Sequence, residues 1–74
     1  MFEELQQTMA SIFGVPPEAI RPDSTLNSIP AWDSVAHLNL MLRLEQDRGV
    51  SITEENILRC ISVPGILDLL AAKD

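Results

Sequence analysis

Apolar side chains near the start of the chain recur at steps of three and four positions, which places them on one face of a helix. They are Phe2, Leu5, Met9, Ile12 and Phe13. Two acidic residues, Glu3 and Glu4, fall in the first turn, where the helix dipole favours negative charge. Gly14 then provides a C-terminal stop, with prolines beyond it. The pattern predicts a first helix that ends near Gly14.

Between residues 15 and 33 the apolar positions lose this period, and prolines and an asparagine interrupt the segment. We expect a long loop with at most one short turn. A loop of this length in a small domain needs either a function or anchoring to the core. Five apolar side chains can anchor it: Val15, Ile20, Leu26, Ile29 and Trp32.

A second helix carries apolar side chains on two sides. Asp33 can cap it, and it runs to about residue 47 or 48, where Gly49 stops it. At about 100° per residue, one side holds Leu40, Met41 and Leu44. A roughly opposite side holds Val35, Leu38 and Leu42. A bundle of this size has room to bury one side, so the second side is either a docking surface or is covered by the long loop.

Two further caps complete the predicted architecture. Thr53 can cap a short third helix with Glu54 and Glu55 in its first turn, and Ser62 can cap a fourth that tolerates Pro64. No segment has the alternating pattern of a strand. We therefore predict an all-α fold, a small antiparallel four-helix bundle of three longer helices and one short one, with the long loop between helices 1 and 2.

Length and composition agree with one helical domain over residues 1–74. Hydrophobic residues make up 46% of the chain, but aromatic residues only 4%, and tyrosine is absent. A core of aliphatic side chains suits packed helices better than a β-sandwich. A chain of 74 residues cannot hold both a deep catalytic cavity and a full core.

Charge and cysteine content narrow the possible partners and the compartment. The formal net charge of −6 repels nucleic acid and favours partners with basic surfaces. No long apolar run predicts membrane insertion, and the acidic N-terminus is unlike a signal peptide. The single cysteine, Cys60, cannot form an internal disulfide, so we expect a reducing, cytoplasmic setting.

The segment Trp32-Asp33-Ser34-Val35-Ala36-His37-Leu38 resembles the phosphopantetheine attachment motif of acyl and peptidyl carrier proteins. An Asp-Ser pair alone is also an ordinary helix cap, but the similarity extends over the whole chain. It includes the amphipathic first helix, the proline-containing loop, the acidic short third helix and the Ser62-Val63 start of the last helix. The Trp-Asp-Ser form resembles stand-alone bacterial carriers of specialised pathways, such as polyketide or surface-glycan assembly.

The resemblance implies a non-catalytic carrier protein. Ser34 would bear covalent 4′-phosphopantetheine, whose thiol holds acyl groups as thioesters, and no residue of the chain would be catalytic. Asp33 would help a phosphopantetheinyl transferase to bind and position the target. Further partners would be acyl-loading and acyl-transferring enzymes with basic docking surfaces, and the carrier would be a monomer. The partner-binding residues would be Val35, Leu38, Leu42, Glu45, Glu54 and Glu55.

The sequence departs from the family pattern in two places. Ala36, Asn39 and Arg43 stand on the second helix at positions of the exposed face where carriers of fatty-acid synthesis often have acidic residues. We interpret this as recognition by a dedicated set of partners. Arg48 stands where the family often buries an aromatic side chain, so its stem should lie along the core edge with the guanidinium in water.

Three features admit a chemical or a structural interpretation. His37, three residues after Ser34, could form a Ser-His dyad, but a packing role is favoured because no orienting acid or oxyanion hole accompanies it. Cys60 reads as a packing residue, since no basic cluster surrounds it. Four polar loop residues suggest a calcium loop: Asp23, Ser24, Thr25 and Asn27. The segment lacks the glycine and the closing glutamate of such a loop, however. We therefore predict that these residues cap turns of the loop and that they form no metal site.

Functions outside the acyl carriers remain as alternatives. The apolar side of the second helix could belong to an unmodified helical module that binds another protein. A peptidyl or aminoacyl carrier would share the same motif. Binding to nucleic acid is disfavoured by the charge of −6. The acyl cargo could come from fatty-acid-like, polyketide or other biosynthesis.

Overall fold

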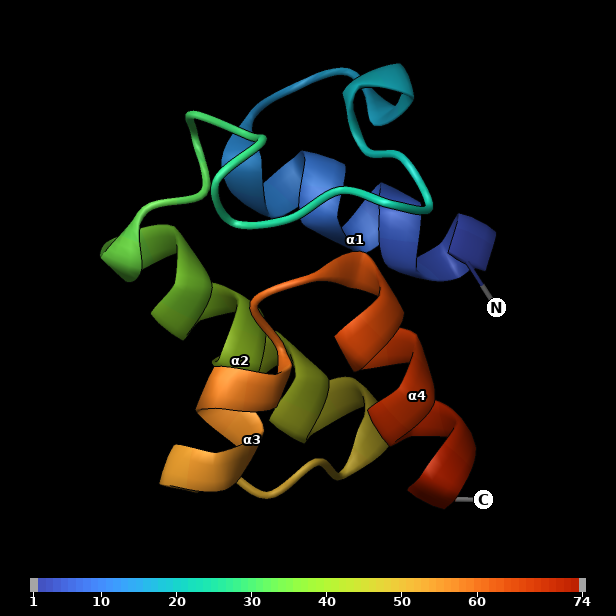
Figure 1. Cartoon of the computed structure of the whole chain (residues 1–74), viewed down its shortest axis with the longest axis vertical. Coiled ribbons are helices and arrows are strands. Elements are labelled where there is room, and N and C mark those ends of the chain that lie inside the picture. The colour runs from blue at the N-terminus through green and yellow to red at the C-terminus, as the bar shows by residue number, and fades with distance from the viewer. Residues whose placement is uncertain (1, 74) are drawn as a thin grey trace.

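Four helices and a short 3₁₀ turn follow one another along residues 2–73, the part of the chain that this computed structural model describes (Figure 1). They are α1 (Phe2–Phe13), η1 (Pro17–Ala19), α2 (Ser34–Arg48), α3 (Glu54–Arg59) and α4 (Val63–Lys73). The predicted all-α bundle, with its short third helix and its long loop after the first, is confirmed. None of the described helices combines the length and the apolar character needed to cross a bilayer.

The helix ends are fixed by the residues that the sequence marks. Gly14 and Gly49 both adopt φ of 68°, the left-handed conformation that ends a helix with little strain when the residue is glycine. At the starts, side-chain oxygens accept hydrogen bonds from backbone N–H groups two or three residues into the helix. Asp33 accepts from Ala36 at 2.8 Å, Thr53 from Asn56 at 3.1 Å and Ser62 from Gly65 at 3.0 Å. Local chemistry therefore explains the end of α1, both ends of α2 and the starts of α3 and α4.

The core lies between α1, α2 and α4 and is filled mainly by aliphatic side chains. Its fully enclosed members include Met9, Leu40, Met41, Val63 and Ile66. Each of these three helices therefore turns one stripe of apolar residues inward, as the three-and-four spacing predicts. Burial of these stripes, rather than helix propensity, stabilises helices of this length.

The long loop is anchored along its length, as predicted. Ile20, Ile29 and Trp32 are buried, and Val15 and Leu26 pack against the core. Two backbone hydrogen bonds of 2.8 Å join the loop to the α3–α4 junction, one from Leu26 N–H to Ile61 O and the other from Val63 N–H to Ser24 O. Figure 1 shows the loop running over α1 before it reaches the start of α2. The loop thus holds both the entry to α2 and the end of α3 in place.

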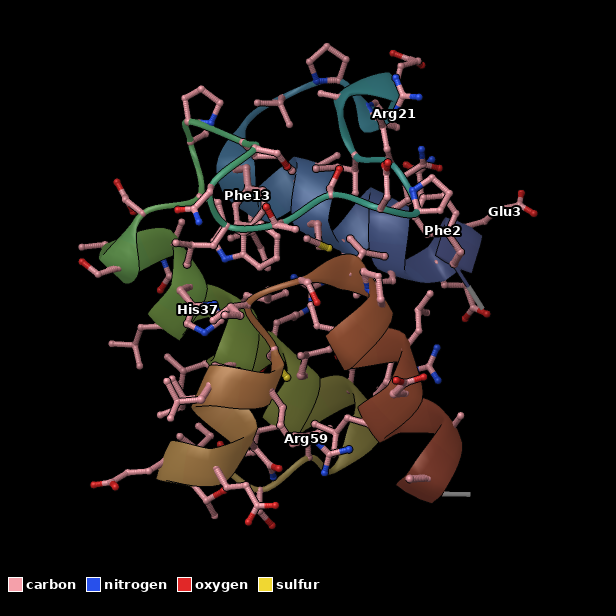
Figure 2. The ribbon with its side chains drawn as sticks, viewed as in Figure 1. Phe2, Glu3, Phe13, Arg21, His37 and Arg59 are labelled. Atoms are coloured by element: carbon pink, nitrogen blue, oxygen red, sulfur yellow. The ribbon has the colours of Figure 1, made fainter. Side chains whose placement is uncertain are left out.

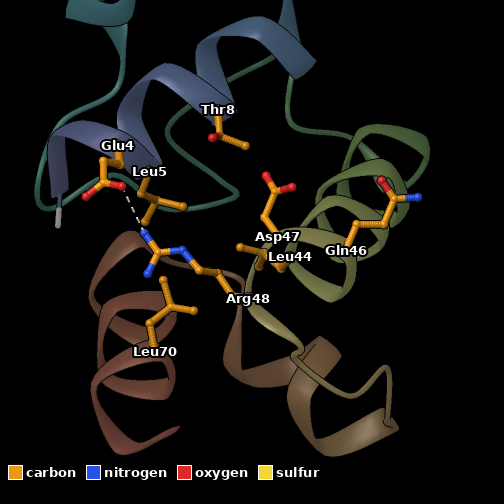
Figure 3. A pocket seen from close by; sticks show the side chains of 8 residues that line it. All are labelled: Glu4, Leu5, Thr8, Leu44, Gln46, Asp47, Arg48 and Leu70. Carbon is orange, nitrogen blue, oxygen red and sulfur yellow. Dashed lines mark hydrogen bonds and ion pairs between the residues drawn. The ribbon is translucent and has the colours of Figure 1, made fainter. Parts of the chain in front are cut away.

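Arg48 lies at the far end of α2, where α1 and α4 also come together (Figure 3). Its side chain is one-third exposed, and its Nη2 atom lies 3.3 Å from Glu4 Oε2. Beneath it a surface pocket of about 470 Å³ has Leu5, Leu44 and Leu70 among its lining residues. The stem covers apolar residues while the guanidinium reaches a solvated carboxylate, which agrees with the prediction from the sequence.

Candidate functional site

Ser34 is the first residue of α2 and its side chain is exposed. The preceding segment reaches it from the buried Trp32, whose ring lies 5.3 Å from that of Phe13. Trp32 therefore pins the loop just before the helix, as the sequence suggested. Three other serine hydroxyls, those of Ser24, Ser28 and Ser62, are hydrogen-bonded to the backbone. The fold presents the Ser34 hydroxyl to solvent on a firmly anchored turn.

The first turn of α2 offers hydrogen-bond donors beside this hydroxyl. The N–H groups of Ala36 and His37 are taken by the side chain and the carbonyl of Asp33, each at 2.8 Å. Those of Ser34 and Val35 have no acceptor within the helix, because the first turn lacks preceding carbonyls. Free N–H groups and the helix dipole both favour an anion at this point. The residues present therefore fit a phosphodiester on the Ser34 oxygen.

The second apolar side of α2 stays exposed. Val35 is 68% exposed, Leu38 53% and Leu42 42%. The alternative in which the long loop covers this side is wrong, because the loop packs on α1 and on the α3–α4 junction instead. Ala36, which the family pattern placed with the exposed positions of α2, is buried, because it lies on the same side of the helix as Leu40 and Leu44, four and eight residues later.

Two residues that the sequence did not single out extend this surface. Leu58 on α3 is 69% exposed, and Ile61 just after α3 is 45% exposed. The sequence offers little indication that these two residues are exposed, since a helix of six residues is too short for its apolar spacing to define a face. Only the position of α3 beside α2 shows that they join the same surface.

An apolar groove of about 510 Å³ begins at Ser34 and runs between α2 and α3. Its lining comes from α2, from the loop, and from α3 with the residues after it. The lining residues are Leu26, Ser34, His37, Leu38, Met41, Ile57, Leu58 and Ile61. A serine at the mouth of an apolar groove places any group attached to its oxygen next to a surface that favours hydrocarbon.

His37 is buried at the base of this groove, and both of its ring nitrogens are engaged. Nδ1 lies 3.0 Å from Trp32 Nε1, and Nε2 lies 2.9 Å from the carbonyl oxygen of Ile57. A Ser-His dyad would need one of these nitrogens to face the Ser34 hydroxyl. The structural interpretation is therefore confirmed. Figure 2 shows His37 on α2, beside the segment that connects α3 to α4.

Carboxylates surround the exposed apolar residues at some distance from Ser34. Glu45 on α2 and Glu54 and Glu55 on α3 are exposed. None of the three is ion-paired with a side chain that the structure describes. Arg43, by contrast, is paired with Asp47 at 2.9 Å, which neutralises its part of α2. The predicted partner-binding residues thus all lie at the surface, with the apolar ones nearest Ser34.

The remaining candidates have structural surroundings. Cys60 is buried directly after α3, and loss of solvation raises the pKa of its thiol despite the opposing charge of Arg59. Ser24 accepts a hydrogen bond from Arg21 N–H at 2.8 Å, which is the loop capping expected of this segment. Within residues 2–73 no group of three or more His, Cys, Asp or Glu side chains is arranged to hold a metal ion.

Comparison with known proteins agrees with this geometry. Residues 3–70, from α1 to α4, match the family model described as a phosphopantetheine attachment site. No curated protein matches the chain at a significant level. The family match covers far more than half of the chain and includes the exposed serine at the start of α2. The chain therefore belongs to the phosphopantetheine-binding carrier protein family, whose members are non-catalytic carriers of a covalent 4′-phosphopantetheine that a phosphopantetheinyl transferase attaches.

Proposed function

We propose that Ser34 is the attachment residue and that the chain carries apolar acyl groups as thioesters between enzymes of a biosynthetic pathway. The observation that carries this proposal is the position of an exposed serine at the N-terminus of α2, at the mouth of the apolar groove. Once attached, the phosphopantetheine arm supplies a terminal thiol for thioester chemistry. Family membership removes the unmodified interaction module as an alternative.

The chain's own residues prepare Ser34 for modification without activating it. No base faces the hydroxyl, since the nearby His37 is engaged with Trp32 and Ile57. The proton must therefore be removed by a group of the transferase. Asp33 holds the first turn of α2 through Ala36 N–H and leaves the amides of Ser34 and Val35 free for the phosphate. We assign Asp33 the second task of meeting the transferase, since its carboxylate side chain is exposed beside Ser34.

The attachment is tested by incubating the purified protein with coenzyme A and a broad-specificity phosphopantetheinyl transferase and measuring its intact mass. We expect a gain of one phosphopantetheine group in the wild type and none in Ser34→Ala. Ser51→Ala is the matched control, because Ser51 is an exposed serine outside the helix N-termini. Modification of Ser34→Ala, or a loss of modification in Ser51→Ala, would contradict the assignment.

The nature of the groove supports an apolar acyl cargo, as in fatty-acid-like or polyketide pathways, over an aminoacyl one. All lining residues other than Ser34 and His37 are aliphatic or thioether side chains, and the polar atoms of His37 are already hydrogen-bonded. An aminoacyl group would bring a charged ammonium into surroundings that offer it no partner. A hydrocarbon chain would leave water at no such cost.

Cargo class is tested by loading the arm with octanoyl or with an aminoacyl group of similar size and comparing thermal stability with the unloaded carrier. Burial of the octanoyl chain in the groove should raise Tm, because a ligand bound only by the folded state stabilises it. The aminoacyl form should have the same Tm as the unloaded carrier. Equal Tm values for all three forms would show that the cargo stays outside the groove.

We further propose a docking surface made of Val35, Leu38 and Leu42 with Leu58 and Ile61, bordered by Glu45, Glu54 and Glu55. Its centre is apolar and exposed, and its carboxylates are available for basic groups on partner enzymes. Residues 34–44 contain no acidic side chain, so along this part of α2 a partner meets no carboxylate after Asp33 until Glu45. This distribution supports a dedicated partner set. We also propose that the carrier acts as a monomer in the cytoplasm, a reducing compartment that suits its unpaired Cys60.

Partner choice is tested by offering the loaded carrier to a general fatty-acid ketosynthase and a general transacylase. Slow transfer is expected, since these enzymes would find no carboxylate on α2 between Ser34 and Leu44. Transfer at the rates of a fatty-acid carrier would contradict the dedicated partner set. Replacing Leu38 by glutamate should reduce transfer to the cognate enzymes, whereas Asn39→Ala, an exposed neighbour, should not.

A further inference from the structure

The two hydrogen bonds of His37 determine which of its nitrogens carries the proton. The indole N–H of Trp32 can only donate, so His37 Nδ1 must accept and is unprotonated. A neutral ring then has its proton on Nε2, which donates to the carbonyl oxygen of Ile57 at 2.9 Å. The ring of Trp32 also lies 6.0 Å from that of His37, so indole and imidazole form one buried unit. His37 therefore links three segments: the loop before Ser34, α2 and α3.

The carbonyl that His37 reaches is one that α3 cannot satisfy by itself. Ile57 belongs to the last turn of α3, whose carbonyls have no N–H four residues further along the helix. The neighbouring Asn56 carbonyl accepts from Cys60 N–H at 3.0 Å. Ile57 receives its donor from a side chain twenty positions earlier in the chain. Because this bond is part-buried, its loss would leave a polar group without a protein partner and with reduced access to water, which costs more than the loss of an exposed bond would.

Few other contacts fix the position of α3. None of its six residues is fully buried, in contrast to α1, α2 and α4. It is held by the partly buried Ile57, by Cys60 directly after it, by the bond from Leu26 N–H to Ile61 O and by the close approach of Gly65 in α4 to the Arg59 carbonyl. A short helix with so little burial belongs to the least stable parts of a fold. The part-buried hydrogen bond from His37 is the link from α3 to α2, whereas the contact at Gly65 holds α3 against α4.

We propose that His37 is the positioning residue of this carrier: by tying α3 to α2 it sets the width of the apolar groove beside Ser34. Ile57 and Leu58 of α3 line one side of the groove, and Leu38 and Met41 of α2 line the other. The link from His37 to Ile57 joins these two sides at the base. Trp32 holds the imidazole in the orientation and proton state that make the link possible. The effect on cargo rests on the proposed function, whereas the effect on α3 does not.

Two spectroscopic measurements on the unloaded protein test the link itself. A long-range ¹H–¹⁵N spectrum of the imidazole should show the proton on Nε2 and none on Nδ1. Amide hydrogen exchange of Cys60, which bonds to Asn56 O, reports on α3, and that of Ile66, which bonds to Ser62 O, reports on α4. In His37→Leu we expect the Cys60 amide to exchange about tenfold faster while the Ile66 amide changes little.

The matched variant is His37→Gln, which keeps a side-chain N–H donor for the Ile57 carbonyl. Its Cys60 amide should exchange close to the wild-type rate. A proton on Nδ1, unchanged exchange in His37→Leu, or equal exchange in the two variants would overturn the proposal. If His37→Leu does not fold, Trp32→Phe replaces it, because this variant keeps an aromatic ring but lacks the indole N–H. The proposal then requires a mixture of imidazole tautomers and faster exchange at Cys60.

A third measurement connects the link to cargo. The arm is loaded with butanoyl, hexanoyl, octanoyl or decanoyl groups, and the cleavage rate of each thioester by hydroxylamine is measured. In the wild type and in His37→Gln longer chains should be protected until the groove is full, and in His37→Leu this dependence on length should flatten. Retention of the wild-type profile by His37→Leu would refute a role in setting groove width. A flat wild-type profile would refute the apolar cargo alone, since the exchange data judge His37 separately.

Discussion

Adding one methyl group at Gly65 should destabilise the protein, although alanine is the better helix former. Gly65 is the third residue of α4, at the point where α4 passes the end of α3. A Cβ atom built there would collide with the backbone carbonyl oxygen of Arg59, and it would lie 3.1 Å from Ser62 Oγ. The carbonyl is part of the backbone of α3, so it cannot move aside alone. Gly65→Ala must therefore push α3 and α4 apart.

The magnitude follows from three opposing contributions. Helix propensity favours alanine over glycine by about 1 kcal/mol. Overpacking of a well-packed site costs about 1–3 kcal/mol, and a collision with the backbone belongs at the upper end. The capping bond from Gly65 N–H to Ser62 Oγ, 3.0 Å long, is disturbed as well, which costs about 1 kcal/mol. The net loss is about 3 kcal/mol, and for a domain of this size it lowers Tm by about 12 °C or more.

Urea denaturation followed by circular dichroism measures this loss as a change in the free energy of unfolding. Gly14→Ala serves as the control, because Gly14 has φ of +68° but no neighbour within 4 Å of a built Cβ. It should lose only the conformational cost of about 1–2 kcal/mol. A Gly65→Ala variant as stable as the wild type would refute the close approach of α3 and α4, and with it the position of α3 beside the groove.

Three further substitutions or modifications test the core, the cap and the cysteine. Leu40→Ala should lower the free energy of unfolding by about 2–5 kcal/mol, because Leu40 is fully buried. Leu38→Ala, on the exposed side, should change it by less than about 1 kcal/mol. Equal losses in urea denaturation would contradict the assignment of the two sides of α2. Asp33→Ala should lower the free energy of unfolding by about 1 kcal/mol, because the helix cap is lost. Asp33→Asn should keep the wild-type stability but be modified more slowly by the transferase. Modification of Asp33→Asn at the full rate would contradict the proposed role of the Asp33 charge. The Cys60 thiol should react slowly with iodoacetamide in the folded protein, because burial raises its pKa. Its thiolate then forms only at a higher pH than that of a solvent-exposed thiol. Rapid alkylation without urea would show that α3 opens freely.

The sequence was informative wherever a local rule decides the structure. The capping residues Asp33, Thr53 and Ser62 each make the expected hydrogen bond to the backbone. The positive φ of Gly49 ends α2 where a glycine was needed. The two apolar sides of α2 followed from the angle per residue, and the structure buries one and exposes the other. These features depend on residues a few positions apart, so they can be read along the chain.

Features that depend on distant residues could not be read in this way. The partner of His37 Nε2 is a backbone carbonyl twenty positions away, and a carbonyl leaves no mark in the sequence. Leu58 and Ile61 joined the exposed surface only because α3 lies beside α2. Ala36 was a different case, because it was placed by comparison with the family pattern, whereas its spacing of four and eight residues from Leu40 and Leu44 already puts it on the buried side of α2.

The central claim is that the hydroxyl at the tip of α2 is the place where the arm is attached. Proteolysis of the modified wild-type protein, followed by fragmentation of its peptides in a mass spectrometer, locates the added group on a single residue. The account predicts fragment ions that carry phosphopantetheine on Ser34. Assignment of the group to any other residue, such as the helix-capping Ser62, would contradict it.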